Sequence, residues 1–158
     1  MHSDHGMEHS RAVTDQAQRS RARAELDRQL NRLMNDIPGA EKALLGAGDG
    51  LKLSHTAMPQ DDADRMAATI TGMLSLAQHH FKDRNGRTRQ AIYEHDGAYL
   101  FVIHAGLEGA DLENTVLAVE VSISADVGLV GHQMKRFIRQ LQESLVIAAR
   151  HPNLSPQQ

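Results

Sequence analysis

The chain has 158 residues, 17 basic and 20 acidic side chains with a formal net charge of −3, and no cysteine. This charge balance gives no electrostatic basis for wrapping nucleic acid or lying on an anionic membrane. The absence of cysteine excludes a disulfide scaffold, a zinc–thiolate site and a thiol nucleophile, and the length suits a single domain.

The first segment, residues 1–22, has hardly any large aliphatic side chains and is rich in His, Ser, Arg and Gln. It buries too little apolar surface to offset its conformational entropy, so we expect a disordered tail over 1–22. His2, His5 and His9 have metal-ligating side chains, but without a fourth ligand or a rigid frame they predict no metal site. The segment lacks the apolar core of a signal peptide, and no apolar run reaches the length of a membrane span. A cytoplasmic protein is therefore expected.

Large aliphatic residues recur at helical spacing over residues 26–37, and Pro38-Gly39 ends this first predicted helix. Two short apolar runs follow, at 43–45 and 51–53, on either side of Asp49-Gly50. Asp-Gly between apolar runs indicates a hairpin, because the two central residues of a type I′ turn need positive φ.

The three glycines of this hairpin, Gly46, Gly48 and Gly50, also raise the question of a phosphate-binding loop. Such a loop needs the pattern G-x-x-x-x-G-K-[ST] and a helix directly after it. Here no Lys-Ser or Lys-Thr follows, and the next segment is a strand, which also fails the dinucleotide-binding pattern. We therefore expect the glycines to turn a hairpin, and we predict no cofactor.

A second helix is predicted from Gln60 to Phe81, with the acidic pair Asp61 and Asp62 at the positive end of its dipole. Strands are then predicted at 88–95, which reads as an edge or half-buried strand, at 99–105 and at 115–123, with a turn at Asp96-Gly97 and a final helix at 126–150. The order α-β-β-α-β-β-β-α, with hairpin-linked strands, predicts one α/β sandwich whose helices cover an antiparallel sheet. The domain is expected over residues 23–151, followed by a loose tail at 152–158.

No catalytic arrangement emerges from the titratable residues. His79 and His80 point about 100° apart on a helix and do not face one metal together. His104, in an apolar strand, is better explained as a hydrogen-bonded core histidine than as a base. Ser122 and Ser124 have no local His-Asp partner. We therefore expect a protein that is not an enzyme.

The second helix has an unusual outer face. Its inner face should pack on the sheet and carries Ala63, Ala67, Ile70, Leu74, Ala77 and Phe81. The opposite face is small and partly apolar where an ordinary surface helix carries Glu, Lys and Gln, and Gly72 in mid-helix costs about 1 kcal/mol relative to alanine. Either a loop of the same chain covers this face, or, as we favour, another molecule does. The predicted interface residues are Arg65, Ala68, Thr69, Gly72, Met73, Ser75, Leu76 and His79.

From Glu25 to about Arg150 the chain resembles the roadblock/dynein-light-chain family, in particular actinobacterial members encoded beside a sensor kinase and a Ras-like GTPase. The matching stretches are LDRQLNRLMNDIPGAEKALLGAGDGLKL, DDADRMAATITGMLSLAQHHF, DGAYLFVIHAG and LAVEVSISADVGLVGHQMKRF. The sequence departs from the family pattern in its His-rich tail and in the acidic loop 107–114, which is longer than expected.

The resemblance implies a five-stranded sheet with one helix on one face and two on the other. It also implies a homodimer that joins sheets edge to edge and pairs the second helices across a two-fold axis. As function, it implies a non-catalytic regulatory or scaffold module that binds a Ras-like small GTPase in a bacterial signalling system, with the nucleotide held by the partner. An arginine finger supplied by Arg65 has little support, because one exposed arginine is weak evidence. The alternative is a small-molecule sensor domain, against which the scarcity of aromatic residues argues.

Overall fold

The structure is a computed structural model that describes residues 4–47, 50, 52–56, 58–107 and 113–150. The elements are α1 (Asp4–Asp36), β1 (Ala40–Gly46), β2 (Lys52–Thr56), α2 (Gln60–His80), β3 (Gln90–His95), β4 (Ala98–His104), β5 (Val116–Ser122) and α3 (Val127–Arg150). This order confirms the predicted α-β-β-α-β-β-β-α succession. The expected loose tail at 152–158 and most of the acidic loop 107–114 lie outside the described residues.

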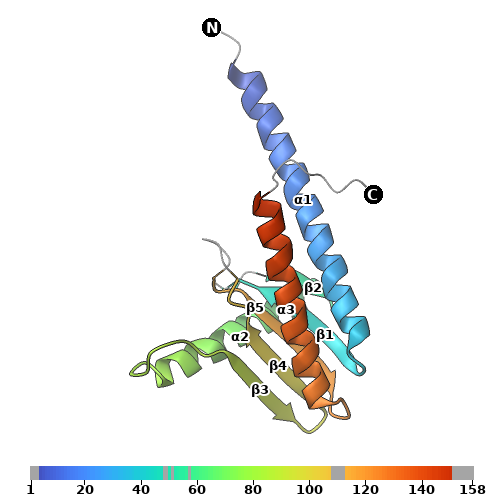
Figure 1. Cartoon of the computed structure of the whole chain (residues 1–158), viewed down its shortest axis with the longest axis vertical. Helices are drawn as coiled ribbons and strands as arrows, with labels where there is room; N and C mark the ends of the chain where they lie inside the picture. Colours follow the sequence, from blue (N-terminus) through green and yellow to red (C-terminus); the bar gives the residue numbers. More distant parts are fainter. Residues whose placement is uncertain (1–3, 48–49, 51, 57, 108–112, 151–158) are drawn as a thin grey trace.

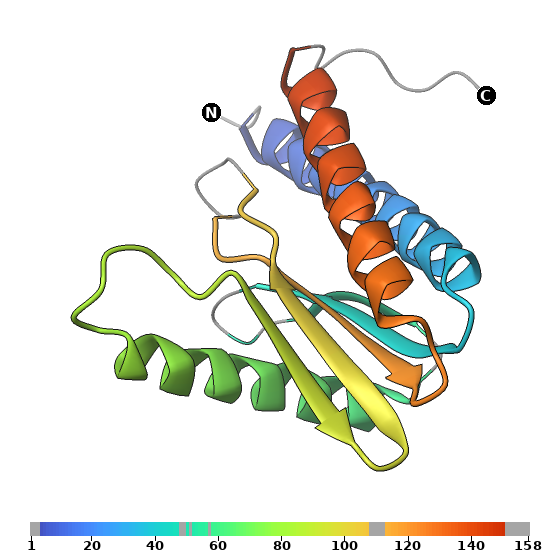
Figure 2. The same cartoon turned by 60° about the horizontal axis from the view of Figure 1, so that its bottom comes forward.

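The five strands form one sheet in the order β2-β1-β5-β4-β3, and each neighbouring pair is antiparallel. Strand β5 is central, because its Val119 pairs with Ala43 of β1 on one side and with Phe101 of β4 on the other. Helices α1 and α3 lie on one face of the sheet and α2 on the other, as Figures 1 and 2 show. The α/β sandwich with one helix opposite two is confirmed.

Each face of the sheet has its own hydrophobic core. Side chains of a strand alternate between the faces, so the neighbours Phe101 and Val102 enter different cores. Phe101 packs with Leu30 of α1 and Met134 of α3, and all three are fully buried. Val102 packs with Ile70 of α2. The small second core is built largely from alanine and valine, so α2 approaches the sheet closely and turns its opposite side to solvent.

The prediction of a disordered tail over residues 1–22 is wrong for residues 4–22, which continue α1 as a regular helix. Residues 6–25 are all exposed, and Figure 1 shows this part of α1 extending beyond the sheet. The segment lacks proline and is rich in Ala, Arg and Gln, which favour helix. Because the packed segment that begins at Leu26 already forms a helix, each added residue gains a hydrogen bond without a new nucleation cost. The tail needs no core of its own to be helical.

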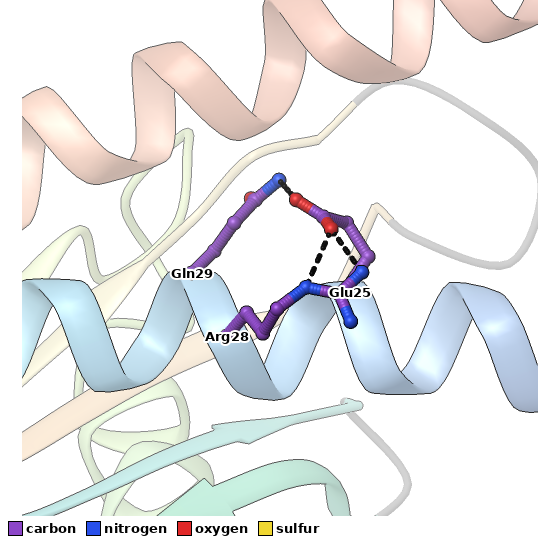
Figure 3. Close-up of polar contacts among 3 residues, drawn as sticks. All are labelled: Glu25, Arg28 and Gln29. Carbon is purple, nitrogen blue, oxygen red and sulfur yellow. Dashed lines mark hydrogen bonds and ion pairs between the residues drawn. The ribbon is translucent and has the colours of Figure 1, made fainter. Parts of the chain in front are cut away.

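Polar side chains reinforce α1 where the packed and exposed parts meet. The Glu25 carboxylate accepts hydrogen bonds from Arg28 at 2.5 and 3.0 Å and from Gln29 at 3.0 Å, one helical turn away (Figure 3). The hydrogen bonds from Arg28 and then Gln29 lower the pKa of Glu25 below its usual range. In addition, Ser54 of β2 donates a hydrogen bond to the carboxylate of Asp27, which fastens the first packed turn of α1 to the sheet.

The predicted hairpin after β1 is confirmed, but its two-residue turn at Asp49-Gly50 is not. The last pair of the ladder is Gly46 with Lys52, after a register shift, so five residues separate the strands. The Gly50 amide donates to the carbonyl of Ala47 at 3.0 Å. Gly50 is therefore the last residue of a four-residue turn, and Asp49 lies outside the described residues. Gly50 does have a φ of +86°, a backbone conformation that favours glycine.

The end of α2 also differs from the prediction. The sequence pattern places Phe81 on the face that packs on the sheet, whereas the helix ends at His80 and Phe81 is 45% exposed. Burial declines along the helix, from fully buried Ala63 and Ala67 to half-buried Leu74. In Figure 2 the C-terminal end of α2 extends past the sheet. Periodicity alone does not reveal that the sheet ends before the helix does.

Candidate interaction surface on helix α2 and strand β3

Helix α2 begins at Gln60 after the N-cap residue Pro59, whose φ of −60° and ψ of 157° are extended, and it carries Asp61 and Asp62 in its first turn. Both carboxylates suit the positive end of the helix dipole. Ala63 and Ala67 fall on the sheet side and are buried. This fixes the rotation of the helix about its axis and thereby determines which residues face outward.

The predicted interface residues lie on the solvent side of α2. Seven of the eight are exposed, and Met73 is half-buried. Leu76 is 73% exposed, the highest value among the exposed large hydrophobic side chains of the described residues. A Cβ built at Gly72 meets no heavy atom within 4 Å. The alternative in which a loop of the same chain covers this face is therefore excluded for the part of the chain that the structure describes.

Two polar side chains on this face, Thr69 and Arg65, have partners within the helix. The Thr69 hydroxyl donates to the carbonyl of Arg65 at 2.8 Å, and the Arg65 guanidinium lies 3.6 Å from the carboxylate of Asp62. The remaining surface is made mostly of small and apolar groups, so another helix can approach it closely without burying an unpaired charge. The arrangement suits association and places no nucleophile beside a base.

Strand β3 adds a second unsatisfied feature, an open sheet edge. It pairs with β4 on one side, and among the described residues no strand follows it in the sheet, in agreement with the prediction of an edge or half-buried strand. Tyr93 faces the α2 side, where it packs against the second core, while Ile92 on the opposite side is 43% exposed. An edge of this kind presents unpaired backbone amides and carbonyls to any strand that docks beside it.

The charges along this edge are separated by sign. Arg89 precedes β3, whereas Glu94 lies near its end and Asp96 follows it. A basic start and an acidic end make the edge complementary to an antiparallel copy of itself.

The other residues considered from the sequence do not form a site. His79 and His80 are exposed in the last turn of α2, and Ser122 and Ser124 contact each other at 3.0 Å. No group of three or more His, Asp or Glu side chains among the described residues is placed to hold a metal ion. Within the same residues, no helix is both long and apolar enough to cross a bilayer.

His104 is half-buried at the end of β4, and both of its ring nitrogens have neighbours. Nδ1 accepts a hydrogen bond from the Gly106 amide at 3.2 Å, and Nε2 lies 3.4 Å from Nη1 of Arg87. Burial and the charge of Arg87 lower the pKa of His104 below its usual range, and a hydrogen bond with Asn114 acts in the opposite direction. The ring is hydrogen-bonded, as expected from the sequence, but it is half-buried and does not lie in the core.

One cluster was missed by the sequence interpretation. The segment between α2 and β3, KDRNGRTRQ, contains Lys82, Arg84, Arg87 and Arg89, and the structure gathers the last two around a cleft with Lys135 of α3. A charged run around Asn-Gly is ordinary for a surface loop. The cluster could have been predicted from the spacing of Arg87 and Arg89 just before a strand, because residues two positions apart in an extended segment lie on the same face.

Comparison with known proteins identifies the fold family. Residues 26–118 match the sequence model of the Roadblock/LC7 domain. A Roadblock/LC7 domain from Streptomyces avermitilis is 30% identical, with a TM-score of 0.67 over 76% of this chain and 97% of that one. A comparison with curated proteins gives no match.

Two MglB structures are similar in fold. MglB of Myxococcus xanthus is 18% identical with a TM-score of 0.67, and the match covers 78% of this chain and 89% of that one. The gliding protein MglB of Thermus thermophilus is 23% identical with a TM-score of 0.62, over 73% and 84%. The family match spans more than half of this chain and includes α2 and β3. The chain therefore belongs to the Roadblock/LC7 domain family.

Proposed function

We propose that this chain is a homodimeric regulatory or scaffold module that binds a Ras-like small GTPase in a bacterial signalling system. Family members are regulatory or scaffold proteins rather than enzymes. The observation that carries the proposal is the exposed face of α2. On this face Leu76 is exposed to solvent one helical turn from Gly72. An exposed apolar face of this kind marks an interaction surface.

The first part of the proposal is that α2 pairs with α2 of a second copy. Small side chains at Ala68, Gly72 and Ser75 recur every three or four residues, which lets two helix backbones approach closely. Leu76, one turn from Gly72, then packs against the partner helix and leaves water. Burying such a side chain contributes about 1.5–3 kcal/mol per copy.

The second part is that the β3 edges join in the same dimer. A two-fold axis beside the middle of β3, between Ile92 and Tyr93, pairs the two copies antiparallel and extends the sheet across both chains. In that register Arg89 lies opposite Asp96 of the partner subunit, and the same pair forms again at the other end. A parallel alignment brings like charges together instead, so charge favours the antiparallel register.

The third part concerns the GTPase. The glycine-rich segment of this chain turns a hairpin, so the proposed role leaves nucleotide binding to the partner. Arg65 is 76% exposed and lies near Asp62, and we assign it to the dimer surface rather than to catalysis. A sensor kinase of the same system is a further proposed partner.

The test is a binding assay with a Ras-like small GTPase of the same organism, loaded with GDP or with a non-hydrolysable GTP analogue. We expect binding that differs between the two nucleotide states, because a regulator discriminates the switch regions. Absence of binding in both states would refute the GTPase assignment while leaving the dimer proposal to its own test.

The small-molecule sensor alternative requires a ligand enclosed between the sheet and a helix. Along the first half of α2 that space is occupied by core side chains, including Ala67, Ile70 and Val102, which are at most 4% exposed. Along the second half, a pocket of about 370 Å³ between Leu74 and Val116 is open to solvent and does not enclose a ligand. The interaction module is therefore the better supported of the two functions.

A further inference from the structure

A cleft of about 700 Å³ lies where the segment before β3 meets the end of β4 and helix α3. Its lining includes Asn85, Arg87, Arg89, Ile103, His104 and Lys135. The volume falls within the range of about 300–1,000 Å³ typical of small-molecule sites. The cleft lies outside the α2 face on which the dimer proposal rests.

The cleft is strongly positive although the chain as a whole has a net charge of −3. Arg87, Arg89 and Lys135 line it, and among the described residues no aspartate or glutamate does. In the described part of the chain, none of these three cations forms an ion pair. Converging cations without counter-ions repel one another, and a bound anion removes that repulsion.

The backbone holds these groups in place. The His104 amide donates to the carbonyl of Arg89 at 2.9 Å, which continues the β3–β4 ladder beyond the end of β3. The Nη1 atom of Arg87 donates to the backbone carbonyl of Glu113 at 3.1 Å, which orients the guanidinium without neutralising it. Lys135 projects from a regular turn of α3. The cations therefore come from two segments of the fold, the one before β3 and helix α3, and are not one flexible tail.

We propose that this cleft binds the phosphate groups of a small phosphorylated ligand, held by Arg87, Arg89 and Lys135. Guanidinium groups present several N–H donors in a planar fork that matches phosphate oxygens, and lysine adds a compact charge. The volume exceeds that of a single phosphate, so the proposal is for a di- or oligophosphate group with room for part of the molecule that carries it. The site shares Arg89 with the proposed β3 contact, whereas Arg87 and Lys135 take no part in the dimer proposal.

The test is isothermal titration of the full-length chain with inorganic pyrophosphate at low ionic strength. We expect saturable binding of one pyrophosphate per chain, which weakens when salt shortens the screening length. Arg89→Gln and Lys135→Gln should each weaken binding about fivefold to tenfold, in line with the loss of one charge-assisted hydrogen bond. Both positions are exposed, so the variants keep the core intact, and thermal melting verifies this.

The matched control is Arg139→Gln. Arg139 is an exposed cation one turn along α3 from Lys135 and does not line the cleft. Its loss should change the affinity for pyrophosphate by less than about twofold, because salt screens a charge at that distance. Equal weakening in Arg139→Gln and Lys135→Gln would overturn the assignment, since only net charge would then matter.

Two further results would also overturn it: no saturable heat with pyrophosphate, or citrate binding as tightly as pyrophosphate. Citrate carries a similar charge on carboxylates, so it separates phosphate recognition from general anion attraction. Lys135 lies on α3 and takes no part in the proposed α2 and β3 contacts, so Lys135→Gln should leave the oligomeric state unchanged. Because Arg89 also belongs to the proposed β3 contact, Lys135→Gln is the variant that tests the phosphate assignment independently of the dimer.

Discussion

Replacing Gly72 with glutamate separates the stability of the fold from the stability of the proposed dimer. Gly72 lies in the interior of α2, and a Cβ built on it meets nothing within 4 Å. Within one chain the new side chain therefore causes no steric clash. It also replaces the residue with the poorest helix propensity after proline, which should stabilise the isolated helix by about 0.5 kcal/mol.

In the proposed dimer, the same substitution is destabilising. Two Glu side chains, one from each copy, would be brought together where the helices pack. At about 4 Å, like charges repel by about 4 kcal/mol near a protein surface, and removing them from water adds to this cost. Even partial relaxation leaves about 3 kcal/mol, so the dissociation constant of the dimer should rise more than about a hundredfold.

Light scattering across a concentration series measures the dimer, and thermal unfolding of the monomer measures the fold. Gly131→Glu is the matched control, because Gly131 also lies within a helix, in α3, with open space around a built Cβ. It makes the same chemical change on another helix and should leave the dimer intact. A wild-type chain that is monomeric at micromolar concentration, or a Gly72→Glu chain that dimerises like wild type, would refute the placement of the interface.

Three other predictions concern the sheet edge, helix α1 and the core. Arg89→Asp and Asp96→Arg should each weaken the dimer, and the double variant should recover about 1 kcal/mol in sedimentation experiments; no recovery would contradict the antiparallel register. The pKa of Glu25 is lowered by Arg28, so its contribution to α1 is present above its unfolded pKa of about 4.5 and is lost as pH falls through the lower folded value. Carbon-detected NMR titration should place the midpoint below that of an unfolded peptide, and an unshifted midpoint would disprove the contact. Leu30→Ala should destabilise the fold by about 2–5 kcal/mol in urea unfolding, because Leu30 is fully buried; a loss below about 1 kcal/mol would argue against this core.

Most of the fold follows from local sequence patterns. The helical spacing over residues 26–37, the acidic start of α2 at Asp61 and the apolar run of β4 each indicate their element without tertiary information. The outward face of α2 can also be predicted from the sequence. Each helical residue is rotated by about 100° from the one before it, so Gly72 lies opposite Ala63. These features depend on the spacing of apolar residues, which can be read from the sequence without a structure.

Other features depend on long-range geometry and were not predictable in the same way. Residues 4–22 look unstructured when judged by their own apolar content, yet they extend a helix anchored at Leu26. The length of the turn ending at Gly50 depends on a register shift at Gly46, and this shift follows from pairing with β2. The phosphate-cleft candidate joins Arg89 to Lys135, which lie 46 positions apart in the numbering, and no local pattern relates them.

Because half of α1 is exposed, the free energy of local unfolding differs along this helix. Its backbone hydrogen bonds form one continuous ladder, but only the part from Leu26 onward is held by side-chain burial. Opening of the first turns exposes no core and costs little, whereas opening near Leu30 requires the first core to separate. Amide protons should therefore exchange fastest near His9 and progressively more slowly toward Leu33. The number of helical turns ahead of the domain should therefore fall as temperature rises, while the sheet and its cores stay unchanged.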